Sequence, residues 1–276
     1  MSALARHGMH EKLATSESTT HKMPGHWILA RMGKRVLRPG GLQLTHQLLD
    51  DLDIRSTDDV VEFAPGLGVT TRLTLARNPA SYVAVERDAA AAETVRAYLT
   101  DARHRCITGS AEETGLPLAS ASVVYGEAML SMHPASTKVR IVREAARLLR
   151  PDGRYGIHEL CLVPNDVADD VRQGIQRDLS DEIHVGVRPL TVAEWREILE
   201  AAGLEVVSQR SAPMHLLEPR RLVQDEGLLG ATRFLWNVAT HADARKRVLR
   251  MRRIFRKYRS NLAAVAFVSH KPIVST

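Results

Sequence analysis

The sequence predicts an α/β protein: a doubly wound, mostly parallel sheet of seven strands with helices on both faces and helical insertions. Short β-rich runs alternate with helical patterns from residue 58 to 161, which is typical of a parallel sheet with crossover helices. A glycine-rich turn joins the first strand to the first of these helices. With 276 residues, of which 44% are apolar and 25% charged, the chain is long enough to bury such a core.

Each predicted strand is a short apolar run bounded by turn residues. The seven strands are expected at residues 59–63, 82–86, 105–108, 122–125, 154–160, 204–208 and 262–268.

The helices between the strands are predicted from residues that typically start or end a helix. One begins near Thr70, and an alanine-rich one spans 88–99. Ser136 is expected to cap a third helix. Thr191 and Glu194 form a capping box at the start of a fourth.

The remaining segments suggest a single domain over residues 24–276, preceded by a flexible polar arm at 1–23. A helical region is expected at about 24–52, and insertions at about 162–190 and 211–261. No apolar run approaches the ~20 residues of a membrane span. The two cysteines are too few for a disulfide framework or a Cys-rich metal site, so we expect a cytoplasmic location and no metal.

The most informative segment is the turn after the first strand, where Glu62 is followed by Ala64, Pro65, Gly66 and Gly68. Glycine lets a ligand approach the backbone closely and permits positive φ. The dinucleotide pattern G-x-G-x-x-G is incomplete here. A nicotinamide-dependent oxidoreductase therefore stays open as an alternative.

Three further groups end or follow neighbouring strands. Glu86 ends the second strand, where a carboxylate can accept both hydroxyls of a ribose. Ser110-Ala111-Glu112 follows the third strand, and Gly126 to Leu130 follows the fourth. All of these lie at the carboxyl edge, where open parallel sheets bind ligands.

Together these segments resemble the class I S-adenosylmethionine (SAM)-dependent methyltransferases, especially the small-molecule branch that includes quinone-ring methyltransferases. The resemblance covers about residues 58–161 and implies a Rossmann-like fold with SAM as cofactor. Ala64 departs from the family's first glycine, and Ser110 replaces its usual Asp. The cofactor contacts that it implies are Glu62, Ala64, Pro65, Gly66, Gly68, Glu86, Arg87, Ser110, Ala111, Glu112, Gly126 and Leu130.

Candidates for catalysis lie after the fourth and fifth strands. His133 is the first choice as general base, with Glu159 and Glu127 behind it. His158 and Glu159 are adjacent in a strand, so at most one of them faces the ligand.

His26 and Trp27 lie in the amino-terminal region, which often closes over the cofactor in the family that the chain resembles. We expect both to contact substrate. Alternatively, Trp27 serves as a hydrophobic anchor of this region.

The basic segment 245–259 holds nine Arg or Lys residues and no acid. Val248, Met251, either Ile254 or Phe255, and Tyr258 recur at helical spacing, which predicts an amphipathic helix. It either packs on the domain with a solvated cationic face, or contacts a membrane surface, an anionic substrate or, least favoured, RNA.

The expected function is in-line methyl transfer from SAM to oxygen, carbon or nitrogen of a small-molecule acceptor, leaving S-adenosylhomocysteine. No Asn/Asp-Pro-Pro-Tyr motif follows the fourth strand and neither cysteine follows a proline, so no DNA partner is expected. A third hypothesis is a non-catalytic SAM-fold protein that binds a membrane or partner through residues 245–259.

Overall fold

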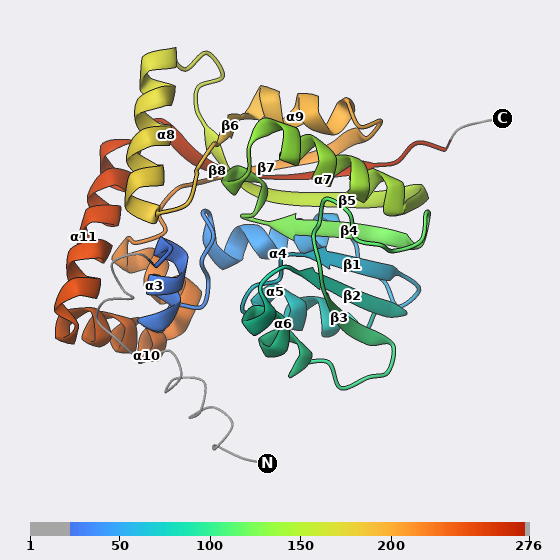
Figure 1. Cartoon of the computed structure of the whole chain (residues 1–276), viewed down its shortest axis with the longest axis horizontal. Helices are drawn as coiled ribbons and strands as arrows, with labels where there is room; N and C mark the ends of the chain where they lie inside the picture. The colour runs from blue at the N-terminus through green and yellow to red at the C-terminus, as the bar shows by residue number, and fades with distance from the viewer. Residues whose placement is uncertain (1–22, 274–276) are drawn as a thin grey trace.

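The computed structural model describes residues 23–273, built around one sheet with helices on both faces (Figure 1). The strand order is β3-β2-β1-β4-β5-β8-β7, and the short strand β6 pairs with β5. Strands β1 to β5 are parallel, whereas β8 is antiparallel to both β5 and β7. The strands are β1 (Asp59–Phe63), β2 (Ser81–Glu86), β3 (His104–Thr108), β4 (Ala121–Glu127), β5 (Leu149–Leu162), β6 (Leu190–Thr191), β7 (Glu205–Pro213) and β8 (Leu262–His270).

The doubly wound α/β fold is confirmed, with one strand more than expected. The eighth strand is β6, which pairs alongside Cys161 and Leu162 at the end of β5. The polar arm expected at 1–23 lies outside the described residues, apart from Met23.

Ten helical segments occur within residues 23–273, and none of them is long and apolar enough to cross a bilayer. They are α3 (Gly25–Arg31), α4 (Gly41–Asp51), α5 (Val69–Leu75), α6 (Ala89–Arg96), the 3₁₀ turn η1 (Leu130–Met132), α7 (Ala135–Leu148), α8 (Asp169–Ile183), α9 (Val192–Glu200), α10 (Pro219–Thr240) and α11 (Ala242–Lys257).

Strand β1 shows why the sequence places helices on both faces of the sheet. Val60 packs in the core under α4 and α6, whereas its neighbours Val61 and Phe63 pack in the core under α7 and α9. A parallel strand buried on both faces reads as a nearly continuous apolar run, and β1 has the sequence DVVEF.

Local sequence signals correctly predict the residue at which α9 starts, but not the residue at which α7 starts. The capping box at α9 is confirmed: Glu194 N–H donates to Thr191 Oγ1 at 3.3 Å, and Thr191 N–H donates to Glu194 Oε2 at 2.7 Å. The cap expected at Ser136 is wrong, because α7 already begins at Ala135 with Pro134 in the cap position. Proline fixes its own φ and thereby starts the helix without a side-chain cap.

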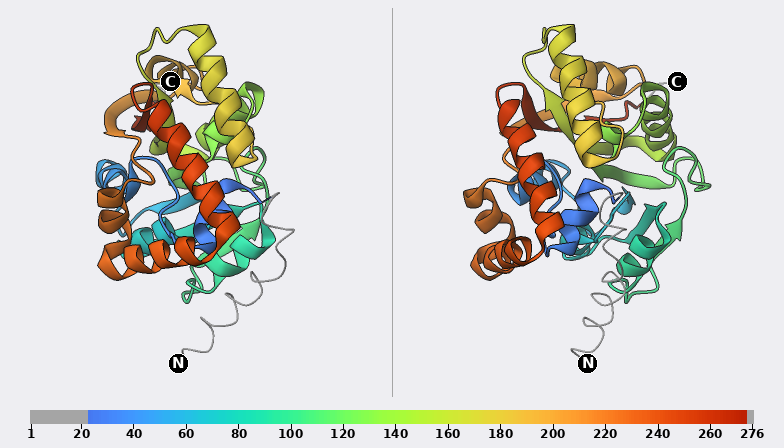
Figure 2. Two further views of the ribbon diagram at one scale, coloured as in Figure 1. Left: turned by 90° about the vertical axis from the view of Figure 1, so that its left-hand side faces the viewer. Right: turned by 60° about the vertical axis from the view of Figure 1, so that its left-hand side comes forward.

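Helices α3, α8, α10 and α11 form a helical cap at one end of the sheet (Figures 1 and 2). Their apolar sides share a third core, which includes Leu29 of α3, Leu179 of α8, Phe234 of α10 and Met251 of α11. Strand β4 points toward this end in Figure 1, so the cap lies over the carboxyl ends of the parallel strands. The basic segment 245–259 is thus largely helical and buries Val248, Met251 and Phe255 in the cap core.

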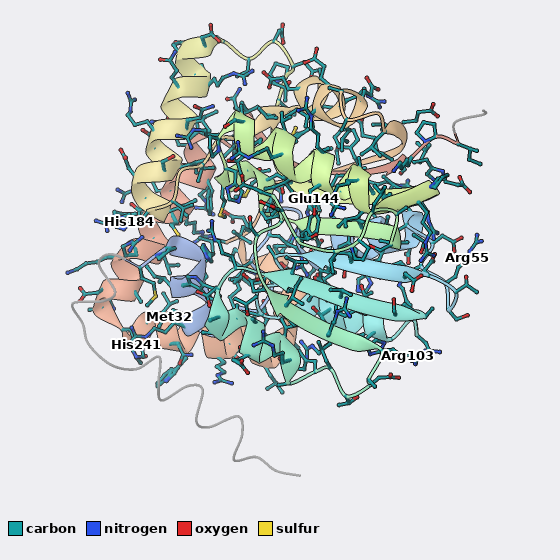
Figure 3. The ribbon with its side chains drawn as sticks, turned by 45° about the vertical axis from the view of Figure 1, so that its right-hand side comes forward. Met32, Arg55, Arg103, Glu144, His184 and His241 are labelled. Carbon is teal, nitrogen blue, oxygen red and sulfur yellow. The ribbon has the colours of Figure 1, made fainter. Side chains whose placement is uncertain are left out.

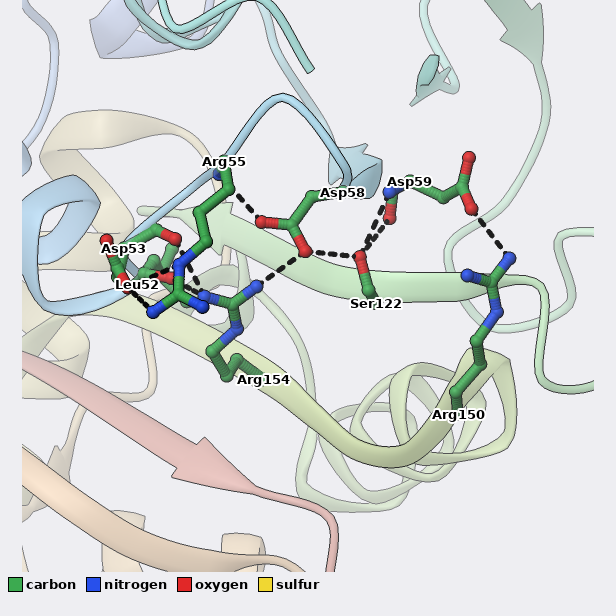
Figure 4. A network of polar contacts seen from close by, with 8 residues as sticks. All are labelled: Leu52, Asp53, Arg55, Asp58, Asp59, Ser122, Arg150 and Arg154. Carbon is green, nitrogen blue, oxygen red and sulfur yellow. Dashed lines mark hydrogen bonds and ion pairs between the residues drawn. The ribbon is translucent and has the colours of Figure 1, made fainter. Parts of the chain in front are cut away.

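The opposite end of the sheet is closed by polar contacts. Figure 3 shows Arg55 and Arg103 there, far from Met32, His184 and His241. Asp58 accepts hydrogen bonds from Ser122 Oγ at 2.7 Å and Arg154 Nη2 at 2.6 Å, which joins the starts of β1, β4 and β5 (Figure 4).

A buried charge cluster fastens the segment 34–42 to α10 of the cap. Lys34 Nζ lies 3.5 Å from Asp225 Oδ2 and 3.7 Å from Glu226 Oε1, and all three side chains are fully buried. Both carboxylates also accept backbone hydrogen bonds: Leu42 N–H donates to Asp225 Oδ1 and Val36 N–H donates to Glu226 Oε1, each at 2.9 Å. Satisfied in this way, the charges tolerate burial.

We predict that Gly41→Ala destabilises the protein by about 3 kcal/mol, combining left-handed strain with overpacking. Gly41 has φ +65°, and a Cβ there would lie 2.4 Å from Asp225 Oδ1. Urea unfolding measures the loss. The control is Gly115→Ala, where φ is +71° but nothing lies within 4 Å of the added Cβ, so only strain remains. Equal losses in the two variants would contradict the packing role of Gly41.

Candidate functional site

The candidate site lies where the sheet changes winding direction. Strand β1 pairs with β2 on one side and β4 on the other, so the connections after β1 and β4 leave on opposite faces. Such a switch point opens a crevice at the carboxyl ends of the strands. The glycine turn after β1, Glu86 of β2 and Glu127 of β4 all lie at this edge.

The glycine turn leaves room beside its backbone. A Cβ on Gly66, whose φ is +54°, would meet nothing within 4 Å, so this part of the turn faces open space. A Cβ on Gly68 would lie 2.8 Å from the ring of Tyr98, which shows that Gly68 serves packing. Ala64, in place of the family's first glycine, still adopts φ +49°. The substitution therefore keeps the turn at the cost of about 1–2 kcal/mol of strain.

Glu86 holds the turn from the neighbouring strand. Its Oε2 accepts the Gly66 N–H at 3.0 Å, and its Oε1 accepts the Asp88 N–H at 2.9 Å. A carboxylate offers about four acceptor directions, so one remains on each oxygen for a ligand. The following residue, Arg87, is exposed.

The segment after β3 is already engaged with the protein. Ser110 Oγ accepts the Glu112 N–H at 3.1 Å, and Arg140 Nε of α7 donates to Glu112 Oε2 at 2.7 Å. Ala111 is buried in the core under α7. Their contact with SAM, which the resemblance implies, stays a prediction.

Glu127, at the end of β4, is the centre of a polar network. Its Oε1 accepts Thr45 Oγ1 at 2.7 Å and lies 2.7 Å from Nδ1 of His158. Its Oε2 accepts Thr70 Oγ1 and lies 3.2 Å from Nη1 of Arg38. Although burial by itself would raise the pKa of Glu127, the charge of Arg38 and the hydrogen bond from His158 lower it to about 2. Glu127 is therefore an anion.

Arg38 is the site residue that sequence reasoning missed. Its Nε and Nη2 atoms are buried and have no hydrogen-bond partner among residues 23–273. Buried donors of this kind are rare and need an acceptor. The sequence signal is only an Arg before Pro-Gly-Gly, which does not tell where the side chain points.

Glu62 points into the protein. Its Oε2 accepts hydrogen bonds from the Tyr82 hydroxyl and, at 2.9 Å, from Thr71 Oγ1. Burial raises the pKa of Glu62 to about 7, against the hydrogen bonds from Tyr82, Tyr125 and Thr71. Its contact with SAM stays a prediction, since the hydrogen bonds that Glu62 accepts all come from within the protein.

The two adjacent residues of β5 face opposite sides, as expected. His158 Nε2 donates to the Pro39 carbonyl at 2.6 Å, on the side of Glu127. Glu159 accepts the N–H groups of Met129, Leu130 and Ser131 at 2.7–3.0 Å and Ser131 Oγ at 2.6 Å. Glu159 therefore holds the turn after β4 in place.

The turn after β4 is packed tightly on the sheet. Leu130 is buried in the core under α7, and a Cβ on Gly126 would lie 3.3 Å from Phe63 Cβ.

An apolar pocket of about 60 Å³, the cap pocket, lies between this turn and the helical cap. His26 lines it, and its buried Nδ1 has no partner among residues 23–273. Burial lowers the pKa of His26, partly offset by the charge of Asp88, so the ring is neutral at neutral pH. The lining also includes Ala128, Ser131, Glu159, Met214, Leu216 and Phe255.

The remaining candidates, Trp27 and His133, are not among the residues that line this pocket. Trp27 is partly buried, and its ring centroid lies 5.1 Å from that of His26. His133 is half-buried; burial and the charge of Arg87 lower its pKa. No cluster of three or more metal-ligating side chains occurs within residues 23–273.

Comparisons with known proteins agree with this geometry. A family described as "Methyltransferase domain" matches residues 60–153. An uncharacterised protein of Haemophilus influenzae is 31% identical over 252 residues, which is 90% of this chain and 98% of that protein. The 27-O-demethylrifamycin SV methyltransferase of Amycolatopsis mediterranei is 27% identical over 59% of this chain and 60% of its own.

Solved structures share the fold at low identity. The phosphoethanolamine N-methyltransferase 2 of Haemonchus contortus, in complex with SAM, superposes with a TM-score of 0.70. Its identity is 13%, and the match covers 96% of this chain and 60% of that one.

We predict that Glu62→Gln removes a pH dependence of stability. With a folded pKa of about 7 and an ordinary value of 4.5, Glu62 favours folding below pH 4.5 and loses that contribution as pH rises through 7. The wild type should therefore lose up to about 3 kcal/mol relative to Glu62→Gln between acid and mildly alkaline pH. Urea unfolding across this range measures it. The exposed Glu197→Gln is the control, and parallel curves for wild type and Glu62→Gln would refute the assignment.

Proposed function

Because the chain belongs to the class I SAM-dependent methyltransferase family, we propose that it methylates a small organic acceptor held in the cap pocket. The observation that carries this proposal is the position of the cap pocket, whose lining includes Ala128, directly after Glu127 at the switch-point crevice. The family assignment sets aside the nicotinamide alternative. Oxygen, carbon and nitrogen acceptors all remain open.

The crevice residues offer groups whose chemistry suits each part of SAM. The spare acceptor directions of Glu86 suit the two ribose hydroxyls, and the open side of Gly66 admits the methionine portion. The unpaired Nε and Nη2 of Arg38 suit a carboxylate, which accepts a guanidinium through two parallel hydrogen bonds. Glu127 positions Arg38 for this contact.

When bound, SAM supplies a methyl group on a positively charged sulfur whose leaving group is neutral. The protein's part is then to align the acceptor and to exclude water. Orientation can lower a barrier by about 7–11 kcal/mol. The apolar walls of the cap pocket, formed by Met214, Leu216 and Phe255, suit an apolar acceptor and keep water out.

Where the acceptor must lose a proton, we propose that His26 removes it. His26 lines the cap pocket, has an unpartnered Nδ1 and is neutral at neutral pH. Glu127 is a weak base because its pKa is about 2, and Glu159 is occupied by the backbone of 129–131. His133 stays the second candidate.

We also propose a reducing, cytoplasmic location, because Cys106 and Cys161 are both free and buried.

The cofactor contacts are tested by calorimetric titration with SAM and with adenosine. Glu86→Ala should weaken both ligands by about a hundredfold, since two charge-assisted hydrogen bonds to the ribose are lost. Arg38→Gln should weaken SAM by about tenfold and leave adenosine within about twofold, because adenosine has no carboxylate.

The control for this titration is Glu93→Ala, an exposed carboxylate of α6 on the same βα unit. Wild-type protein that gives no heat with SAM would refute the proposed function. Equal losses for both ligands in Arg38→Gln would refute the carboxylate contact alone.

The base is tested by the pH dependence of kcat/KM for labelled-methyl transfer to a responsive acceptor from a metabolite extract. In the wild type the rate should fall on the acid side, with an apparent pKa below the ordinary 6.5 of histidine. His26→Gln should lower kcat by about 10²–10⁴ and abolish this limb.

His133→Gln is the matched comparison, because it removes the other candidate imidazole. A loss confined to His133→Gln would move the role to that residue.

A further inference from the structure

A second cavity, of about 1020 Å³, lies between the start of α10 and the carboxyl-terminal half of α11. Both helices belong to the cap (Figure 2). Its floor is the segment 214–217 that leads from β7 into α10. We name it the arginine cavity after five lining residues, Arg220, Arg221, Arg252, Arg256 and Arg259.

The cavity carries an excess of positive charge. Its single lining acid, Glu218, accepts Arg256 Nε at 2.7 Å and Arg252 Nη2 at 3.3 Å. Hydrogen bonds from Arg256 lower the pKa of Glu218 to about 2, so this carboxylate is already neutralised by its partners. Within residues 23–273, no ion pair involves Arg220, Arg221 or Arg259.

Two of the arginines that line the cavity each have a guanidinium nitrogen that is buried without a hydrogen-bond partner among the described residues. These nitrogens are Nη1 of Arg221 and Nε of Arg252. Arg221 is 9% exposed, so its charge is largely withdrawn from water. A buried, unsatisfied charged donor is costly unless an anion meets it, and the planar guanidinium matches phosphate and carboxylate.

The arginine cavity and the cap pocket share one apolar wall. Met214, Leu216 and Phe255 line both. A molecule with an anionic end among the arginines would therefore place its apolar part against this wall. A flat bilayer surface cannot reach donors buried in a concavity.

We propose that the arginine cavity binds the phosphate or carboxylate group of an amphiphilic small molecule whose apolar part lies against Met214, Leu216 and Phe255. That this molecule is the methyl acceptor rests on the proposed function. Anion binding itself does not.

The experiment is calorimetric titration of the full chain, without SAM, at constant ionic strength. The ligands are propyl and hexyl phosphate, hexanoate, hexanol, inorganic phosphate and phosphatidylglycerol vesicles. Hexyl phosphate or hexanoate should bind more tightly than hexanol, and the gain from propyl to hexyl phosphate should approach about fourfold per CH₂ that reaches the apolar wall. Arg221→Met should weaken hexyl phosphate by about tenfold or more.

Arg253→Met is the matched control, because it removes one exposed charge from α11 outside the cavity and should change binding by less than about twofold. Arg220, which is exposed at the start of α10, provides the second cavity variant, Arg220→Met. This variant tests the proposal if Arg221→Met does not fold.

Three outcomes would overturn the proposal: no heat with either alkyl phosphate or hexanoate, equal losses in Arg253→Met and both cavity variants, or binding only to phosphatidylglycerol vesicles. A parallel titration with SAM separates the two proposals. If the wild-type protein does not bind SAM in this titration, the methyltransferase function is refuted, and the result for anion binding is unaffected.

Discussion

The carboxylate of Glu127 is almost fully withdrawn from water and still carries its charge, because four elements supply partners to it. Thr45 of α4, Thr70 of α5, His158 of β5 and Arg38 of the amino-terminal segment converge on its two oxygens. An ionised group in this position is stable only while all of them stay in place. The crevice at the end of β4 therefore keeps its shape as one polar unit, and the orientation of Arg38 depends on it.

The segment 34–42 couples this unit to the helical cap. Lys34 and Val36 are fastened to Asp225 and Glu226 of α10, and Arg38 follows only a few residues later. The same stretch of backbone thus contacts the cap on one side and the crevice on the other. The cap pocket and the arginine cavity both lie against α11 and the segment 214–216, so the position of the cap sets the space for an acceptor.

Two neighbouring buried acids show how partners, more than burial, determine charge. Glu62 and Glu127 are both removed from water, yet the pKa of Glu62 rises to about 7 and that of Glu127 falls to about 2. Glu62 receives hydrogen bonds from neutral hydroxyls, whereas Glu127 also faces the guanidinium of Arg38. Their mutual repulsion adds to the difference, because ionising both would place two like charges in one core.

The sequence by itself determined seven of the eight strands, the glycine turn, the position of Glu86 and the capping box at Thr191, because these follow from local periodicity, turn chemistry and hydrogen bonds within a few residues. Only the tertiary structure decided that Arg38 meets Glu127, that Glu159 holds the turn at 129–131, and that His26 enters the cap pocket. These contacts join loops and helices far apart along the chain. The direction of a loop side chain is set by what packs against it, and no local pattern records that.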